Sequence, residues 1–181
     1  KQLGTDHAMT SIAGADIGRL FPDVIWHTET PVLRTAPAPM YRLAALVREH
    51  GYKVVVTGEG ADEFLAGYNI FKETMVRRFW ARQPESTIRP LLLRRLYPYI
   101  SGLSGGGDGY LSAFFRRNLT DVDALDYSHQ LRWQNTSRAK RFFSADLVAA
   151  LPPAEPLLLP PGFDRWHPLH QAQYLEATIF L

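Results

Sequence analysis

Residues 53–57 read KVVVT and lead directly into a small-residue turn, residues 58–63, that reads GEGADE. Three consecutive valines without polar alternation predict a strand that is buried on both faces, as in a parallel sheet. A strand that passes through a glycine-rich turn into a helix is the repeating order of an α/β sheet. Because such sheets bind ligands outside the carboxyl ends of their strands, the sequence predicts a ligand-binding turn at residues 57–63.

The amino-acid composition fits one ordinary globular domain, with room for an appendage. The chain has 181 residues, of which 46% are hydrophobic, enough for a sizeable core. A net charge of +2 is too small to indicate a nucleic-acid partner by itself. The absence of cysteine excludes disulfides, thiolate zinc sites and a cysteine nucleophile, and we expect a cytoplasmic protein. No apolar run approaches ~20 residues, so we expect no membrane span.

Two regions of different character follow one another along the chain. Helical spacing at 15–26 and 40–50, a possible short strand at 5–12 and the strand at 53–57 predict a partial α/β domain over residues 1–70. Residues 71–181 are predicted to be its helical continuation. Their helical patterns fall at residues 71–82, 88–99, 110–118, 124–143, 145–151 and 167–181. The start lacks a methionine and the end falls inside a helical pattern, so we expect the domain to be truncated at both ends.

The side chains of the turn suit chemistry as well as chain reversal. Gly58 and Gly60 let a ligand approach the backbone closely, and the amides that follow can hold a phosphate. The carboxylates of Glu59, Asp62 and Glu63 can hold a metal ion or move a proton. In the alternative interpretation the glycines only turn the chain and the carboxylates cap the next helix. A Rossmann fingerprint is excluded, because its third glycine would fall on Glu63.

Residues 54–68, which read VVVTGEGADEFLAGY, closely resemble the second signature of glutamine-hydrolysing asparagine synthetases. Three shorter stretches are similar to the same family and occur in the same order: LGTDH at 3–7, ETP at 29–31 and PMY at 39–41. After about residue 75 the resemblance is loose and implies only that a helical region follows. One departure is Ala66, where the family usually has glycine, and we expect it to affect packing more than chemistry.

The resemblance implies a fold and an activity. The fold would be a piece of the nucleotide alpha-hydrolase-like (HUP/PP-loop ATPase) parallel sheet, followed by a mainly α-helical region. The activity would be that of an ATP-dependent carbon–nitrogen ligase that uses ATP and Mg²⁺. Aspartate would be activated as β-aspartyl-AMP, and ammonia from a glutaminase domain outside this chain would convert it to asparagine.

The family's functional residues can be carried over onto this sequence by position. Thr57, Gly58 and Gly60 would lie against the AMP and phosphate part of the nucleotide. Glu59 would be the catalytic base that accepts a proton from the incoming amine. Asp62 would coordinate Mg²⁺, while Glu63 would be a weaker second ligand or a support for the start of the helix. Arg34 lies near the position of a substrate-binding arginine, although its spacing to PMY at 39–41 differs and a surface arginine in a loop is the favoured explanation.

Other family features are missing from the sequence. The first signature, Ser-Gly-Gly-x-Asp-Ser, which cradles pyrophosphate, does not occur before the turn. The stretch from Ser104 to Gly109 reads SGGGDG, but it follows a helical pattern and lacks the final serine, so we predict a mobile surface loop rather than a phosphate site. For these reasons we expect the 181 residues alone to be inactive.

Two other interpretations remain open. Within the superfamily, the chain could belong to another adenylate-forming amide synthetase, such as a β-lactam or lasso-peptide macrolactam synthetase, although β-lactam-forming relatives tend to have tyrosine where this chain has Glu59. From a different class, it could be a non-catalytic helical binding module. Arginine pairs at 77–78, 94–95 and 116–117 next to aromatic residues resemble an RNA-binding face, but we interpret them as the solvent side of amphipathic helices. The sequence does not indicate the oligomeric state, the source organism or a preference for glutamine over ammonia.

Overall fold

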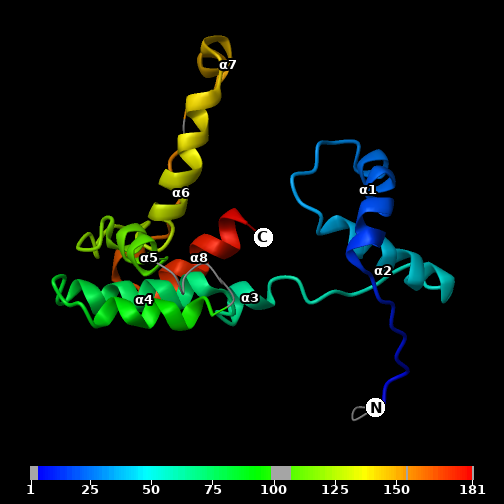
Figure 1. The fold of residues 1–181 in the computed structure, drawn as a ribbon, viewed down its shortest axis with the longest axis horizontal. Coiled ribbons are helices and arrows are strands. Elements are labelled where there is room, and N and C mark those ends of the chain that lie inside the picture. Colours follow the sequence, from blue (N-terminus) through cyan, green and yellow to red (C-terminus); the bar gives the residue numbers. More distant parts are fainter. Residues whose placement is uncertain (1–3, 99–106, 154, 181) are drawn as a thin grey trace. The chain divides into compact units, whose positions relative to one another are not determined.

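The computed structural model describes residues 4–98, 107–153 and 155–180, and it divides the chain into two compact units, residues 1–57 and 58–181 (Figure 1). Unit 1 contains α1 (Gly14–Thr28) and α2 (Pro37–Glu49). The helical elements of unit 2 are α3 (Ala61–Phe64), α4 (Asn69–Ala81), η1 (Arg89–Leu96), α5 (Gly107–Arg116), α6 (Gln130–Ser137), η3 (Arg138–Phe142), α7 (Ala145–Ala150), η4 (Phe163–Arg165) and α8 (Pro168–Ile179). The predicted domain bounds at residue 70 stay a prediction.

The two predicted helices of unit 1 are confirmed, and they pack against each other. Val24 of α1 and Ala38 of α2 are buried, and the rings of His27 and Tyr41 lie 5.6 Å apart. After α2 the chain reverses at Gly51, which has a φ of 78°. This left-handed conformation is the one that glycine adopts without strain at a helix C-terminus.

The predicted parallel-sheet fold is wrong, because residues 4–98, 107–153 and 155–180 contain no β-strand. The segments predicted as strands, 5–12 and 53–57, have no regular hydrogen-bonded partner, and 81% of Val54 and 94% of Val56 is exposed. Branching at Cβ favours extended backbone, but a strand also needs a neighbouring strand to receive its amide hydrogen bonds. The nucleotide alpha-hydrolase-like sheet inferred from the resemblance is therefore not the fold of this structure.

Unit 1 contains an apolar groove, and one of the three valines, Val55, lines it. Met40, Leu43 and Val47 of α2 line one part of it, and Val55 and Thr57 line another, around a volume of about 610 Å³. The valine segment and the groove are thus open to solvent, although three consecutive valines normally indicate a fully buried strand.

Unit 2 is built around α4, which lies against η1 and α8. Trp80 of α4 packs with Leu93, Phe115 and Leu131 in the main core cluster. A smaller cluster joins the first turn of α4 to α8 through residues such as Ile70, Phe71 and Ala172. Helix α8 packs onto both α3 and α4. This packing places the C-terminal part of the chain beside the turn at residues 58–63, called the acidic turn below.

The helical continuation predicted after residue 70 is present, with differences in detail. The predicted helix at 124–143 begins only at α6, since residues 121–129 form turns. The segment at 88–98 contains the 3₁₀ helix η1 instead of an α-helix. Of the predicted loop from Ser104 to Gly109, residues 104–106 lie outside the described residues, and residues 107–109 form the first turn of α5. No helix in the described part of the chain is long and apolar enough to cross a membrane.

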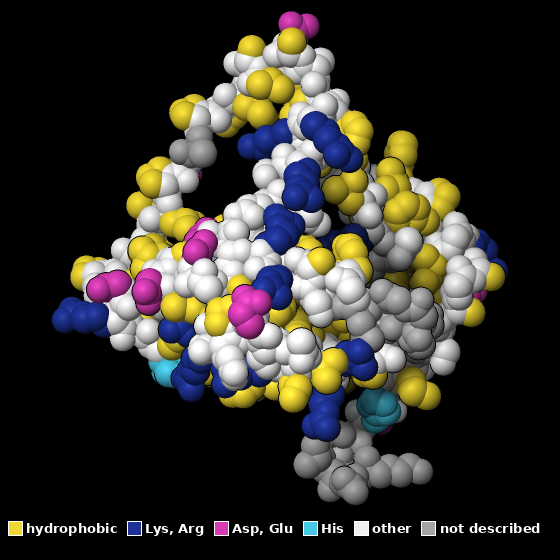
Figure 2. All heavy atoms as spheres, turned by 60° about the vertical axis from the view of Figure 1, so that its left-hand side comes forward, with side chains coloured by type: hydrophobic (Ala, Val, Ile, Leu, Met, Phe, Trp, Pro, Cys, Tyr) yellow, Lys and Arg dark blue, Asp and Glu magenta, His cyan; other side chains and the backbone are white. Residues whose placement is uncertain are grey.

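The segment α6–η3–α7 projects from unit 2 (Figure 1). All of its residues from 135 to 150 are exposed. Figure 2 shows Lys and Arg side chains along this segment, and the exposed cations there are Arg138, Lys140 and Arg141. The amphipathic pattern of 124–143 therefore packs against the core only in its first part, around Leu131.

Candidate functional site

The acidic turn begins unit 2 and changes direction at Gly60. Gly60 is buried and has a φ of 87°, a left-handed conformation that favours glycine at this position. The amide of Ala61 donates a hydrogen bond of 3.3 Å to the Gly58 carbonyl, which closes the turn. Helix α3 has only four residues, so its dipole is short, and any anion here would be held by amides of the turn more than by the helix.

The three carboxylates of the turn have different environments. Glu59 and Asp62 are exposed to solvent, whereas Glu63 is only 7% exposed. The Tyr68 hydroxyl donates a hydrogen bond of 3.0 Å to Glu63 Oε1. That hydrogen bond, together with burial and nearby carboxylates, raises the pKa of Tyr68, so the hydroxyl stays protonated and continues to donate. Two carboxylates therefore face solvent, and the third is engaged inside the unit.

A tight backbone turn closes the C-terminal end of α3. Ala66 has a φ of 57°, and the amide of Gly67 donates a hydrogen bond of 2.8 Å to the Asp62 carbonyl. Leu65 is the C-cap of α3, so Gly67 is the second residue after the cap and Asp62 is the third residue from the helix end. A hydrogen bond between these two positions is characteristic of a Schellman motif. The left-handed position of that motif is usually glycine, which explains why glycine is usual where this chain has Ala66. Our sequence-based explanation, packing, was incomplete, because the backbone conformation also constrains this position.

Replacing Ala66 with glycine tests which of these two effects is larger. Relief of the left-handed backbone should stabilise the protein by about 1 kcal/mol. Loss of one partly buried methyl group, which packs near Ile70 and Phe71, should cost about 0.5 kcal/mol. We expect Ala66→Gly to raise the free energy of unfolding slightly, measured by urea denaturation. A lower free energy of unfolding would show that packing dominates.

Helix α8 supports α3 from a distant part of the sequence. The Gln173 amide donates a hydrogen bond of 2.7 Å to the carbonyl of Phe64, the last residue of α3. Glu176 lies one turn further along α8. Its pKa is raised mainly by burial and also by the negative charge of the nearby Glu63. Tyr68 belongs to the signature at 54–68, but its hydrogen bond to Glu63 was not predicted. Gln173 and Glu176 were missed because nothing in the pattern of α8 pairs it with residues 58–63.

The remaining predicted site residues lie in unit 1. Thr57 is the last residue of that unit and lines the apolar groove. Arg34 is exposed in the segment between α1 and α2. Their roles toward nucleotide and substrate stay predictions.

The donor set of the turn fits one kind of metal site. Among the residues that the structure describes, no three His, Asp or Glu side chains come together as a cage for a metal ion. Mg²⁺ commonly uses one or two protein carboxylates and takes its other ligands from water and substrate phosphates. The exposed carboxylate of Asp62 suits that arrangement, while one oxygen of Glu63 is already engaged by Tyr68.

Two of the three arginine pairs that resembled an RNA-binding face, at 77–78 and 116–117, have structural contacts in unit 2. The arginines were predicted to lie on the solvent side of their helices. That prediction is wrong for Arg77, which is 2% exposed. Arg116 forms an ion pair of 2.9 Å with Glu85 on the surface. Trp80 and Phe115, the aromatic neighbours, belong to the core.

Comparison with known proteins identifies relatives along the whole chain. The family model described as asparagine synthase matches residues 1–181. Amidase chyE of Penicillium rubens is 28% identical over 193 residues, which cover 99% of this chain and 28% of the fungal protein. No solved structure matches the chain.

Two bacterial relatives match about half of the chain. Asparagine synthetase B (glutamine-hydrolysing) of Escherichia coli is 36% identical over 100 residues, which cover 52% of this chain and 17% of that protein. Asparagine synthetase 1 (glutamine-hydrolysing) of Bacillus subtilis is 31% identical over 90 residues, which cover 50% of this chain and 14% of that protein. The chain thus spans less than a third of the length of each of these relatives.

Proposed function

The chain belongs to the asparagine synthase family, and from this premise we propose that its acidic turn forms part of an ATP-using site that makes an amide bond. The observation that carries the proposal is the difference in environment among the three carboxylates of the turn. Glu59 and Asp62 face solvent, where a ligand can reach them, while Glu63 is turned inward against Tyr68. Gly60 at the N-cap of α3 has a left-handed conformation, which lets a ligand approach the backbone beside these two carboxylates.

Each of the predicted site residues has a proposed role. Thr57, Gly58 and Gly60 lie along the AMP and phosphates of ATP, since a hydroxyl and closely approachable backbone amides suit phosphate oxygens. Asp62 would coordinate Mg²⁺, and the bound ion would neutralise phosphate charge. Glu59 accepts the proton that the attacking amine loses. Glu63, because Tyr68 engages it, supports the turn, and Arg34 remains a candidate for contact with the substrate carboxylate.

The proposed substrates are aspartate and ammonia. The aspartate side-chain carboxylate attacks the α-phosphorus of ATP, which releases pyrophosphate and gives β-aspartyl-AMP. Ammonia, supplied by a glutaminase domain outside this chain, then attacks the acyl carbon, loses a proton and displaces AMP to give asparagine. Both bacterial relatives are named asparagine synthetases, which supports this choice of substrate.

A second candidate keeps the chemistry and changes the substrate. Relatives that align with 99% of this chain are named amidases, in Penicillium rubens and Gibberella zeae, whereas the bacterial synthetases align with about half. This coverage favours an enzyme of the same superfamily that acts at an amide bond of a molecule other than asparagine. Omitting aspartate from the assay separates the two candidates, because only the first requires it.

Isotope exchange between pyrophosphate and ATP tests the proposal in the protein that carries this chain. With aspartate and Mg²⁺ present, Asp62→Asn should abolish most of the exchange. Glu59→Gln should slow amide formation about a hundredfold, the size expected for loss of a general base. Glu85→Gln is the matched control, because Glu85 is an exposed carboxylate of the same unit that pairs with Arg116. Unchanged exchange in Asp62→Asn together with unchanged amide formation in Glu59→Gln would refute the proposed site.

A further inference from the structure

We propose that Gly67 is a positioning residue for the Asp62 carboxylate, because the absence of a side chain at Gly67 leaves the space in which that carboxylate lies. The inference rests on the proposed role of Asp62 as a Mg²⁺ ligand. It assigns a function to a residue that contributes no polar side chain of its own.

The space beside Gly67 is occupied by Asp62. A Cβ atom built on Gly67 would overlap Asp62 Oδ1 and would lie 3.0 Å from Asp62 Cγ and 3.3 Å from Asp62 Cα. No ordinary side chain at position 67 is compatible with the carboxylate in this orientation. The Schellman motif produces this contact, since it folds the amide of Gly67 back onto the Asp62 carbonyl at 2.8 Å.

Backbone conformation does not account for glycine at position 67. The glycines with positive φ in the described part of the chain are Gly4, Gly51, Gly60 and Gly162, and Gly67 is not among them. The neighbouring Ala66 has a φ of 57°, where glycine would relieve strain. Glycine thus stands at the position that needs space and alanine at the position that needs left-handed backbone. This allocation points to the Asp62 contact as the constraint on position 67.

Three hydrogen bonds hold α3 in place around this contact. Tyr68 binds the Glu63 carboxylate, Gln173 binds the Phe64 carbonyl, and the Gly67 amide binds the Asp62 carbonyl. Because the backbone is held at these points, an added methyl group at position 67 is relieved most easily by rotation of the Asp62 side chain. Gly67→Ala is therefore expected to redirect the carboxylate while the unit stays folded.

The experiment measures Mg²⁺ binding directly, by calorimetric titration of Mg²⁺ into the protein saturated with a non-hydrolysable ATP analogue. Gly67→Ala should weaken Mg²⁺ binding about tenfold, as is typical when a residue that orients a metal ligand is changed. The midpoint of thermal unfolding should remain close to that of the unmodified protein. Gly109→Ala is the matched control, because a Cβ at Gly109 meets nothing within 4 Å. Unchanged Mg²⁺ affinity in a folded Gly67→Ala protein would overturn the inference.

The double variant Gly67→Ala/Asp62→Ala shows whether Gly67 acts through Asp62. It should bind Mg²⁺ as weakly as Asp62→Ala alone, and additive losses would overturn the inference. If Gly67→Ala fails to fold, removal of the overlapping carboxylate in the double variant should restore folding, and failure to do so would also overturn it. If Asp62→Ala leaves Mg²⁺ affinity unchanged, the proposed metal role is wrong. If Asp62→Ala weakens binding and Gly67→Ala does not, only the positioning role is wrong.

Discussion

Replacing Arg77 with methionine is expected to lower the free energy of unfolding of unit 2 by about 4 kcal/mol, because it leaves several backbone carbonyls without their donor. The Arg77 guanidinium donates to the carbonyl oxygens of Phe115 at 3.3 Å and Tyr127 at 2.9 Å. It also donates to the carbonyls of Arg117 at 3.0 Å and Asn118 at 3.2 Å. Arg77 thus joins α4 to the end of α5 and to the turns before α6.

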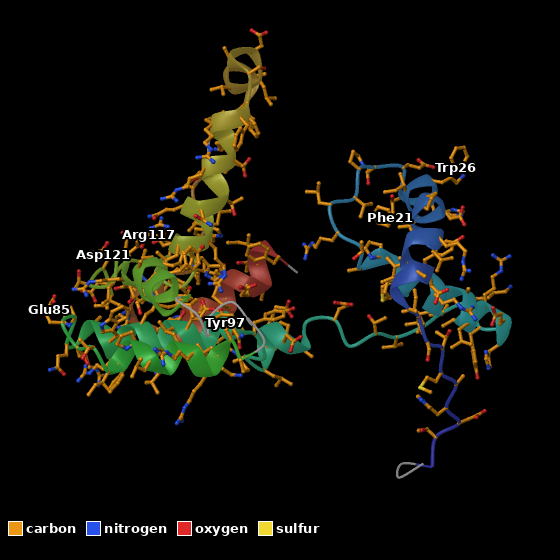
Figure 3. All side chains as sticks on the ribbon, viewed as in Figure 1. Phe21, Trp26, Glu85, Tyr97, Arg117 and Asp121 are labelled. Atoms are coloured by element: carbon orange, nitrogen blue, oxygen red, sulfur yellow. The ribbon has the colours of Figure 1, made fainter. Side chains whose placement is uncertain are left out.

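The guanidinium makes these contacts in a buried site. Burial lowers the pKa of Arg77, and Tyr127 is the first of the groups that oppose this shift. The Arg77 guanidinium carbon lies 4.2 Å from the centre of the Tyr127 ring, so the cation also contacts an aromatic face. Two of the four carbonyls that accept hydrogen bonds from the guanidinium belong to Arg117 and Asn118, on the turn where Figure 3 labels Arg117.

Urea denaturation of three variants measures the effect. Arg77→Lys should cost about 2 kcal/mol, because lysine keeps the charge but not the planar fork that reaches several acceptors. Arg82→Met is the control, since Arg82 is exposed at the end of the same helix and should change the stability by less than about 0.5 kcal/mol. A loss below about 1 kcal/mol for Arg77→Met would mean that water or neighbouring donors replace the guanidinium.

Helices were predicted well from the sequence because their hydrogen bonds are local. The patterns at 15–26, 40–50 and 71–82 correspond to α1, α2 and α4, since apolar spacing and end signals lie within each segment. The strand at 53–57 was wrong because a strand depends on a partner elsewhere. Val54 and Val56 show the difference, since neither belongs to a strand and both are exposed to solvent.

The candidate site divides in the same way between local and long-range features. The turn at 57–63 and the helix after it were predicted from the local sequence, whereas the left-handed conformation of Gly60 came from the structure. The support from Gln173 could not be predicted, because a hydrogen bond across 109 residues of sequence leaves no periodic signal. The burial of Arg77 was also missed, since an arginine on an amphipathic helix is normally exposed and only the tertiary structure supplies its acceptors.

Acidification is expected to destabilise unit 2 through His129, which is 1% exposed. Burial, and secondarily the positive charge of Arg132, lower its pKa from 6.5 to about 4. Ser128 Oγ lies 2.7 Å from His129 Nδ1. Glu176 Oε1 lies 3.2 Å from Nε2, but Nε2 has no hydrogen-bond partner among the described residues. The imidazole is therefore neutral in the folded protein at neutral pH.

The sign of the pH dependence follows from the two states of His129. Between pH 6.5 and about 4 the unfolded chain binds a proton at this histidine and the folded chain does not. The contribution of His129 to the free energy of unfolding is fully present above pH 6.5. It falls by about 3 kcal/mol as the pH decreases to about 4. Glu176 acts in the opposite direction, because its raised pKa lets the folded state bind a proton first as the pH falls. The net slope of the unmodified protein is therefore smaller than that of His129 alone.

A substitution isolates the contribution of His129 from that of Glu176. His129→Gln removes the titrating imidazole and keeps a polar side chain beside Ser128 and Glu176. Free energies of unfolding, measured in urea between about pH 4 and 7, should fall less steeply in this variant, and the difference between the two curves should change by up to about 3 kcal/mol. His170→Gln, an exposed imidazole on α8, is the matched control for loss of a histidine in this unit. Parallel curves for His129→Gln and the unmodified protein would show that the buried imidazole does not govern the acid sensitivity.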